Sequence, residues 1–141
     1  MRVLFDTNVV LDVLLKRAPW VTESAAVWHA SDEGRITGYV LASVLTDIFY
    51  IARKQVNVET ARVAVRTCLE AFEICPVDRE TLEQAEVLPR KDFEDNLQIA
   101  GATIASLDAI VTRNKGDFAG AKLVVLTPAE LLAQLGSANP Q

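Results

Sequence analysis

The sequence has 141 residues, half of them apolar, which fits a single domain with one sizeable core. Its formal net charge of −5 argues against a strong non-specific nucleic-acid binder, because phosphate contacts require Lys and Arg, although an acidic surplus can also be concentrated in a metal site. The apolar runs are far shorter than a membrane span and the N-terminus lacks the pattern of a signal peptide, so we expect a cytoplasmic protein.

Short strands and helices alternate along the first half of the chain. Runs of β-branched and apolar residues predict the strands, while polar caps and helical spacing of apolar residues predict the helices. In chain order, the expected elements are a strand at Arg2–Phe5, helices at Val9–Leu15 and Trp20–Asp32, a strand at Ile36–Leu41, a helix capped by Ser43 and running to about Lys54, and a helix capped by Asn57. The last of these should bury one face, made by Val58, Ala61, Val65, Cys68, Leu69 and Phe72.

The same alternation continues through the second half, where the helix starts are clearer. Asp92, with Asp95 three residues later, forms an acidic variant of the capping box, and Thr127 with Glu130 forms the usual one. The expected elements are a strand at Glu73–Val77, a helix capped by Asp78 over Arg79–Leu88, a helix from Asp92 to about Ser106, strands at Ala109–Val111 and Leu123–Leu126, a helix from Thr127, and a flexible tail at Gly136–Gln141.

This alternation predicts an α/β domain with a mostly parallel sheet. Ligands of such sheets bind in the crevice outside the carboxyl ends of the strands. Polar residues that directly follow a strand are therefore the first candidates for a functional site.

Four carboxylates are the candidate catalytic residues. Asp6 directly follows the first strand, and Asp117 lies in the loop after the fourth. Asp95 lies in the first turn of a helix, where the helix dipole alone would favour an acid. Asp47 has apolar helical neighbours, which is costly for a carboxylate unless it is paired, bound to a cation or turned to solvent. Each has an ordinary structural explanation, but together they predict a cluster.

Polar neighbours could support these acids, and a cation would make the cluster tolerable. Thr7 and Asn8 lie beside Asp6, while Thr112 and Asn114 close the fourth strand. Carboxylates crowded together repel one another, and a divalent cation relieves that repulsion. Hard oxygen ligands with open water positions suit Mg²⁺ or Mn²⁺, which can activate water for attack on a phosphodiester.

Three motifs of the sequence resemble those of PIN-domain proteins, in particular the VapC-like ribonuclease toxins. They are Val3-Leu4-Phe5-Asp6-Thr7-Asn8-Val9, then Asp92-Phe93-Glu94-Asp95, and then Ala109-Ile110-Val111-Thr112-Arg113-Asn114 followed by Asp117-Phe118. The resemblance extends over nearly the whole chain, from about residue 2 to 130. It implies a PIN-like three-layer α/β/α sandwich with a mostly parallel sheet of four to five strands, in a single nuclease domain over residues 1–135.

The resemblance also implies roles for the four acids. Asp6, Asp95 and Asp117 match the family's first, third and fourth acids and would hold Mg²⁺ or Mn²⁺. Asp47 stands where the family usually has Glu, so its carboxylate would reach one methylene less far and assist. The implied activity is metal-dependent endoribonuclease cleavage of RNA by the toxin of a toxin–antitoxin pair, with a small antitoxin protein as partner and a homodimer as assembly.

Basic residues near these motifs are candidates for holding RNA phosphates. They are Lys16, Arg53, Arg113 and Lys115. Lys and Arg also commonly finish helices, where they complement the helix dipole, so their positions have an ordinary explanation too.

Two other functions remain open at this stage. An Asp after the first strand also occurs in phosphotransfer domains that resemble haloacid-dehalogenase-like phosphatases, but their Asp-x-Asp motif would require a second Asp where this chain has Asn8. Because the side chain of Asp47 is shorter than the Glu usual in the family, a PIN-like scaffold that binds RNA or protein without cutting it is the second alternative.

Overall fold

A five-stranded parallel sheet forms the centre of the computed structural model, which describes residues 1–137. The strand order is β3-β2-β1-β4-β5, so the N-terminal strand lies in the middle. The strands are β1 (Arg2–Phe5), β2 (Thr37–Leu41), β3 (Glu73–Cys75), β4 (Ala109–Val111) and β5 (Val124–Leu126). Because all neighbours pair in parallel, the carboxyl ends of the strands meet at one edge of the sheet.

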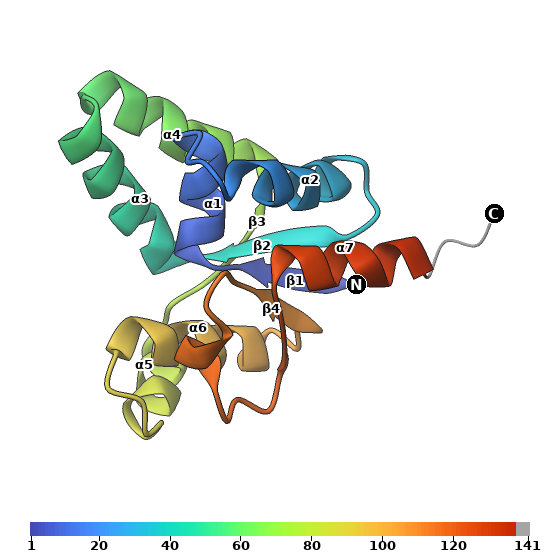
Figure 1. Cartoon of the computed structure of the whole chain (residues 1–141). Coiled ribbons are helices and arrows are strands. Elements are labelled where there is room, and N and C mark those ends of the chain that lie inside the picture. The colour runs from blue at the N-terminus through green and yellow to red at the C-terminus, as the bar shows by residue number, and fades with distance from the viewer. Residues whose placement is uncertain (138–141) are drawn as a thin grey trace.

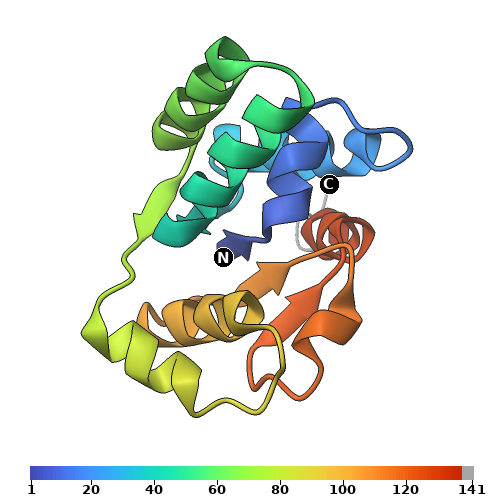
Figure 2. The ribbon, with the colours of Figure 1, turned by 90° about the vertical axis from the view of Figure 1, so that its left-hand side faces the viewer.

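Helices cover both faces of this sheet and complete the predicted three-layer α/β/α sandwich (Figure 1). They are α1 (Thr7–Leu14), α2 (Val21–Asp32), α3 (Ala42–Gln55), α4 (Val58–Ala71), α5 (Arg79–Glu86), α6 (Phe93–Ile104) and α7 (Pro128–Ser137), with a short 3₁₀ helix, η1 (Lys115–Phe118). Figure 2 shows α5 and α6 on the side of the sheet opposite α1–α4. Within residues 1–137, no helix is long and apolar enough to span a membrane.

The core lies around the two central strands. Val3, Leu4 and Phe5 of β1 have no exposed surface, and neither has any residue of β4. This is why both segments are continuous apolar runs instead of alternating ones, since helices cover both faces of a parallel sheet. The ring of Phe72, at the end of α4, packs against those of Phe5 and Trp28, with centroids 4.9 and 4.7 Å away.

Side-chain caps begin four of the helices as predicted. Asn57 accepts a hydrogen bond from the backbone N of Thr60 at 2.8 Å, and Asp78 caps α5 in the same manner. Asp92 caps α6 by accepting from the backbone N of Glu94, but no hydrogen bond joins Asp95 to the backbone N of Asp92, so the predicted acidic capping box is not formed. Thr127 and Glu130 form a reciprocal capping box at the start of α7. These local contacts are the part of the fold that sequence predicts best, because each cap satisfies orphan amides within its own turn.

Several predicted details differ in the structure: α1 begins at Thr7 instead of Val9, and β3 ends at Cys75 instead of Val77. Ser43 is not an N-cap, because α3 already begins at Ala42 and the Ser43 hydroxyl faces α6. The buried face of α4 is made by small residues, Ala61, Ala64 and Cys68, whereas Val58 and Leu69, which were predicted to be buried, are exposed. Small side chains on this face allow α4 to pack closely against its neighbours. Helix α7 extends through Ser137, into the predicted tail, and residues 138–141 of that tail lie outside the described residues.

Candidate active site

Asp6 and Thr112 lie side by side where the two central strands end. Phe5 of β1 is in register with Val111 of β4, and the next residue on each strand is the polar one. The backbone N of Asp6 donates to the carbonyl of Val111 at 3.0 Å, which extends the strand pairing by one step. The hydroxyl of Thr112 then donates to Oδ2 of Asp6 at 2.8 Å. This is the crevice in which parallel sheets bind their ligands.

Two further donors hold the carboxylate of Asp6, which is only 8 % exposed. Its Oδ1 accepts from the backbone N of Thr7 at 2.8 Å and from Nε2 of Gln98 at 2.9 Å. The side chain of Asn8, by contrast, accepts a hydrogen bond from Arg17 at 3.3 Å instead of bonding to Asp6. With both oxygens engaged, the Asp6 side chain has one fixed orientation.

Asp95 approaches Asp6 because it lies one helical turn before Gln98 on α6. The pKa of Asp95 is raised to about 6, chiefly by burial and then by the charges of Asp92, Asp117 and Asp6 in that order, while the charge of Arg90 opposes them. The three carboxylates named in the sequence therefore influence one another electrostatically.

A chain of hydrogen bonds joins Asp117 to Asp6. The backbone N of Asn114 donates to the hydroxyl of Thr112 at 3.1 Å, and Nδ2 of Asn114 donates to Oδ1 of Asp117 at 3.0 Å. Thr112 in turn donates to Asp6, so the series runs Asp6, Thr112, Asn114, Asp117. Both residues predicted to support the site after β4 take part in it.

Asp47 faces a different carboxylate, Glu94 of α6. Burial raises the pKa of Glu94 to about 7, assisted by the charge of Asp47 and opposed by a hydrogen bond from Ser43 at 3.4 Å. Burial is also the largest cause that raises the pKa of Asp47, and Asp47 and Glu94 lie close enough for each to affect the pKa of the other. Asp92 lies close enough to raise the pKa of Asp47, Glu94 and Asp95 alike, so it connects this pair to the group around Asp6.

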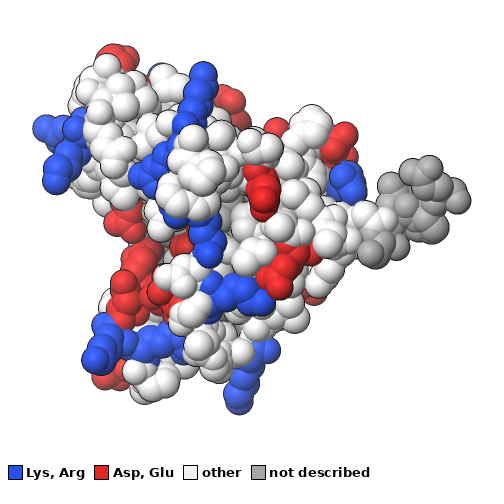
Figure 3. Space-filling model, viewed as in Figure 1, with Lys and Arg blue, Asp and Glu red and all other residues white. Residues whose placement is uncertain are grey.

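The two carboxylate groups form one acidic surface between α3 and the N-terminal end of α6. Figure 3 shows Asp and Glu side chains gathered there, with Lys and Arg around them. Among residues 1–137, no group of three or more His, Cys, Asp or Glu side chains is close enough to hold a metal ion as it stands. The donors nevertheless fit a hard divalent cation, because all are carboxylate oxygens whose mutual repulsion such an ion would relieve.

The four predicted basic residues have different surroundings. Lys16 and Arg53 are exposed near the ends of α1 and α3. Lys115 pairs with Glu130 at 3.1 Å. Arg113 instead turns inward, where its Nη2 donates to Oδ1 of Asp12 at 3.2 Å and its Nε lies 2.7 Å from Oδ2.

Sequence reasoning missed three residues of this region. Gln98 could have been found from its place one turn after Asp95, whereas Glu94 was noticed only as part of an excess of acids around a helix cap. Asp12, with no exposed surface, resembled an ordinary helix residue, and nothing in the local sequence indicated its partner Arg113, 101 positions away.

The fold and the site together define a class of protein: an α/β/α sandwich with a carboxylate cluster at the carboxyl ends of its central strands. The sequence model of the family described as "PIN domain" matches residues 2–116. The chain therefore belongs to the PIN-domain family. No curated protein sequence matches the chain significantly.

Several solved structures with the same fold are toxins or toxin–antitoxin complexes of bacteria. VapC20 of Mycobacterium tuberculosis, described as a sarcin–ricin loop cleaving toxin, superposes with a TM-score of 0.71 at 16 % identity over 86 % of this chain and 96 % of its own. A toxin–antitoxin complex from Klebsiella pneumoniae gives 0.67 at 23 % identity, over 89 % and 97 % of the two chains. VapBC2 from Rickettsia felis, bound to a promoter DNA fragment, gives 0.68 at 17 % identity over 90 % and 98 %.

Proposed function

We propose that this protein is an endoribonuclease that hydrolyses RNA phosphodiester bonds with the help of Mg²⁺ or Mn²⁺. The observation that carries the proposal is the hydrogen-bonded series from Asp6 to Asp117, with Asp95 coupled to both, at the ligand-binding edge of a PIN-domain sheet. One relative of the same fold is described as cleaving the sarcin–ricin loop, which supports RNA as the substrate class.

Asp6, Asp95 and Asp117 would hold the divalent cation, with Asp47 assisting through Glu94. When bound, the ion supplies a Lewis acid that lowers the pKa of water and offsets charge on the phosphate undergoing displacement. The chain's own residues orient the site: Thr112, Thr7 and Gln98 fix Asp6, and Asn114 fixes Asp117. Oδ2 of Asp6 accepts from Thr112 alone, so a lone pair remains for a cation.

Phosphotransfer through Asp6 is a weaker explanation. A phosphoryl-accepting carboxylate must offer an oxygen to its substrate, but Asp6 is 8 % exposed and receives three hydrogen bonds. Those donors suit a carboxylate that is held in place, not one that forms a covalent bond in each turnover.

The biological role that we propose is that of a toxin, acting in the cytoplasm as a homodimer and neutralised by a small antitoxin protein. The support is the fold shared with toxin–antitoxin complexes from Klebsiella pneumoniae and Rickettsia felis. Expression of the chain alone should arrest bacterial growth, and expression of the Asp6→Asn variant should not. Growth arrest by the Asp6→Asn variant as well as by the native chain would contradict a toxin role based on cleavage.

Cleavage of a labelled single-stranded RNA with Mn²⁺, Mg²⁺ or a chelator tests the enzymatic part of the proposal. Asp6→Asn and Asp95→Asn should each abolish cleavage and weaken Mn²⁺ binding measured by calorimetry, because each removes a charge from the cluster. Asp32→Asn, at the exposed end of α2, is the matched control and should leave both unchanged. Undiminished cleavage in both site variants would overturn the assignment. If the native chain cuts no RNA and its Mn²⁺ binding does not depend on Asp6 or Asp95, a non-catalytic PIN-like scaffold becomes the better explanation.

A further inference from the structure

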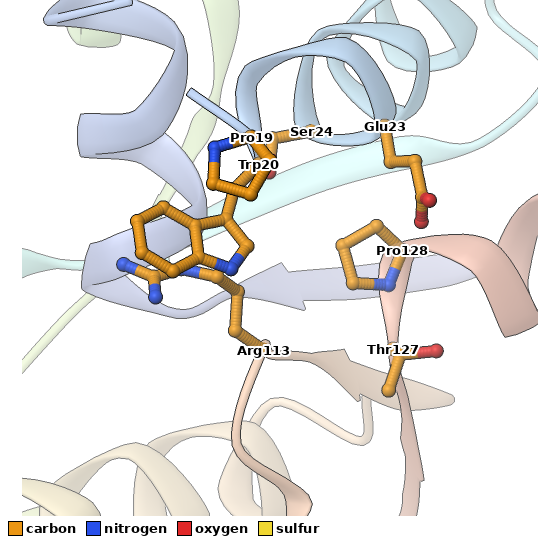
Figure 4. Close-up of a pocket in the computed structure, with 7 residues that line it drawn as sticks. All are labelled: Pro19, Trp20, Glu23, Ser24, Arg113, Thr127 and Pro128. Atoms are coloured by element: carbon orange, nitrogen blue, oxygen red, sulfur yellow. The ribbon is translucent and has the colours of Figure 1, made fainter. Parts of the chain in front are cut away.

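A cavity of about 280 Å³ lies between the start of α2 and the start of α7 and has no role in the proposed chemistry. Trp20 and Arg113 lie on one side of it, and Thr127 and Pro128, at the junction of β5 and α7, lie on the other (Figure 4). The exposed side chain of Glu23 also lines it. The cavity is therefore built from segments far apart in sequence.

Trp20 is the unusual member of this lining. Its indole is 44 % exposed, whereas Trp28, the other tryptophan of the sequence, is buried in the core. The guanidinium carbon of Arg113 lies 3.8 Å from the centroid of the Trp20 ring. Because Asp12 fixes Arg113 from the interior, the indole rests on a rigid support. Exposed aromatic surface that is already held in place costs little conformational entropy when a ligand stacks on it.

The charges around the cavity select against an ionic ligand. An anion would find Arg113 already neutralised by Asp12 and would meet the carboxylate of Glu23. A cation would compete with Arg113 for the Trp20 ring, because the guanidinium group of Arg113 already makes a cation–π contact with that ring. A flat, neutral, aromatic ring with polar edges fits both restrictions, and Glu23 could accept a hydrogen bond from an amino group on such an edge.

The position of the cavity connects it to the candidate active site. Arg113 follows Thr112 directly, and the Thr112 hydroxyl donates to Asp6. Consecutive Cα atoms are about 3.8 Å apart, so the wall of the cavity begins one residue from the carboxylate cluster. A ligand bound at both places must present a phosphate to the carboxylates and a ring to Trp20, as a single-stranded RNA that passes Thr112 and Arg113 would do.

We propose that this cavity is a nucleobase subsite, in which a base next to the scissile phosphate of a single-stranded RNA stacks on Trp20. The inference rests on the proposed ribonuclease function and adds a place where the RNA is gripped. Stacking on aromatic side chains is how proteins commonly hold unpaired bases, and one such contact changes affinity at least about fivefold.

Binding can be measured without cleavage in the Asp6→Asn chain. Titration with a short single-stranded RNA should quench the tryptophan fluorescence, because Trp20 is the exposed indole. The same RNA with an abasic residue at the position that stacks should bind at least about fivefold more weakly, although its phosphates are unchanged. A second substitution, Trp20→Ala, should remove that difference, while Trp20→Phe should retain most of it. Equal affinity for the intact RNA and for every abasic variant of it would overturn the subsite.

Cleavage by the otherwise native chain gives the second readout. Trp20→Ala should raise KM by at least about fivefold with little change in kcat, since the base contact is present before and during the reaction. Tyr50→Ala removes another exposed aromatic ring, on α3, and should leave KM unchanged. Circular dichroism and the melting temperature verify that both variants fold.

The outcomes separate the two proposals. A native chain that fails to cut RNA, but still shows quenching that depends on Trp20, would overturn the ribonuclease function and leave the subsite standing. A chain that cuts RNA with the same KM in the presence or absence of Trp20 would overturn the subsite alone. If RNA is neither cut nor able to quench Trp20, both proposals fail, and a protein side chain becomes the better candidate for the cavity.

Discussion

Nε2 of Gln98 donates a hydrogen bond of 2.9 Å to Oδ1 of Asp6, across 92 positions of sequence. This contact ties the central strand of the sheet to helix α6, which also carries Asp95. It therefore sets the relative placement of two of the proposed catalytic carboxylates.

Replacing Gln98 with Met keeps the length of the side chain and removes the donor. Because a hydrogen bond to a charged group contributes about 1.5–3 kcal/mol, kcat for RNA cleavage should fall about tenfold or more if that bond orients Asp6 in the transition state. Gln84→Met, at an exposed position of α5, is the control and should have no effect. An unchanged kcat in Gln98→Met would show that Thr7 and Thr112 suffice to hold Asp6.

Glu94 should make the metal-free protein less stable as the pH rises. Its pKa is about 7 in the folded chain against an ordinary value of 4.5, so the folded state binds the proton more tightly than the unfolded state does. The stabilisation of the folded state by the protonated Glu94 is fully present below pH 4.5 and is lost as the pH rises through about 7. In the presence of a chelator, Glu94→Gln should therefore melt at a higher temperature than the native chain above pH 7, and the difference should vanish near pH 4.5.

Glu70→Gln, an exposed substitution on α4, is the control for this effect and should leave the melting temperature nearly constant relative to the native chain at every pH. A Glu94→Gln curve parallel to that of the native chain would contradict the proposed burial of Glu94 against Asp47.

Arg113 should contribute to stability through Asp12. Arg113→Met removes the nearest cation from Asp12, whose carboxylate has no exposed surface and then keeps only Arg17 at 3.8 Å and a 3.4 Å hydrogen bond from Ser24. Removing one partner of a buried ion pair typically costs about 3–5 kcal/mol in the free energy of unfolding, and the remaining contacts place the expected loss at the lower end of that range. Adding Asp12→Leu should recover most of that loss, because the buried charge is then gone as well. Urea denaturation measures both, and Arg79→Met, which breaks an exposed pair with Glu83, should cost less than about 1 kcal/mol. A loss that the second substitution does not recover would point to another role for Arg113.

Arg53, in the last turn of α3, should act on RNA by charge alone. Arg53→Gln should raise KM for RNA and make the logarithm of the affinity depend less steeply on the logarithm of salt concentration, because one phosphate contact and its counterion release are lost. Arg66→Gln, exposed on α4, should change neither quantity. The same comparison applies to Lys16. Equal salt dependence in the Arg53 and Arg66 variants would remove Arg53 from the RNA-binding surface.

Local rules predicted the elements that the site depends on. Asp6 and Thr112 were expected at one edge of the sheet because each directly follows a buried apolar run, and the register of Phe5 with Val111 confirms that they are neighbours. The caps Asn57, Asp78 and Asp92 were predictable because a cap contacts amides only two or three residues away. By contrast, the prediction of Ser43 as a cap was wrong, because its hydroxyl donates a hydrogen bond to Glu94 on another helix.

The sequence by itself determined the strand and helix order, the parallel sheet and the edge at which Asp6 stands, because these follow from hydrophobic pattern and from contacts within a turn. Only the tertiary structure decided that Gln98 holds Asp6, that Asp47 lies close to Glu94 and that Arg113 turns inward to Asp12. The physical reason is that such contacts join elements packed from different layers, where the distance between two side chains depends on helix placement and not on their separation along the chain.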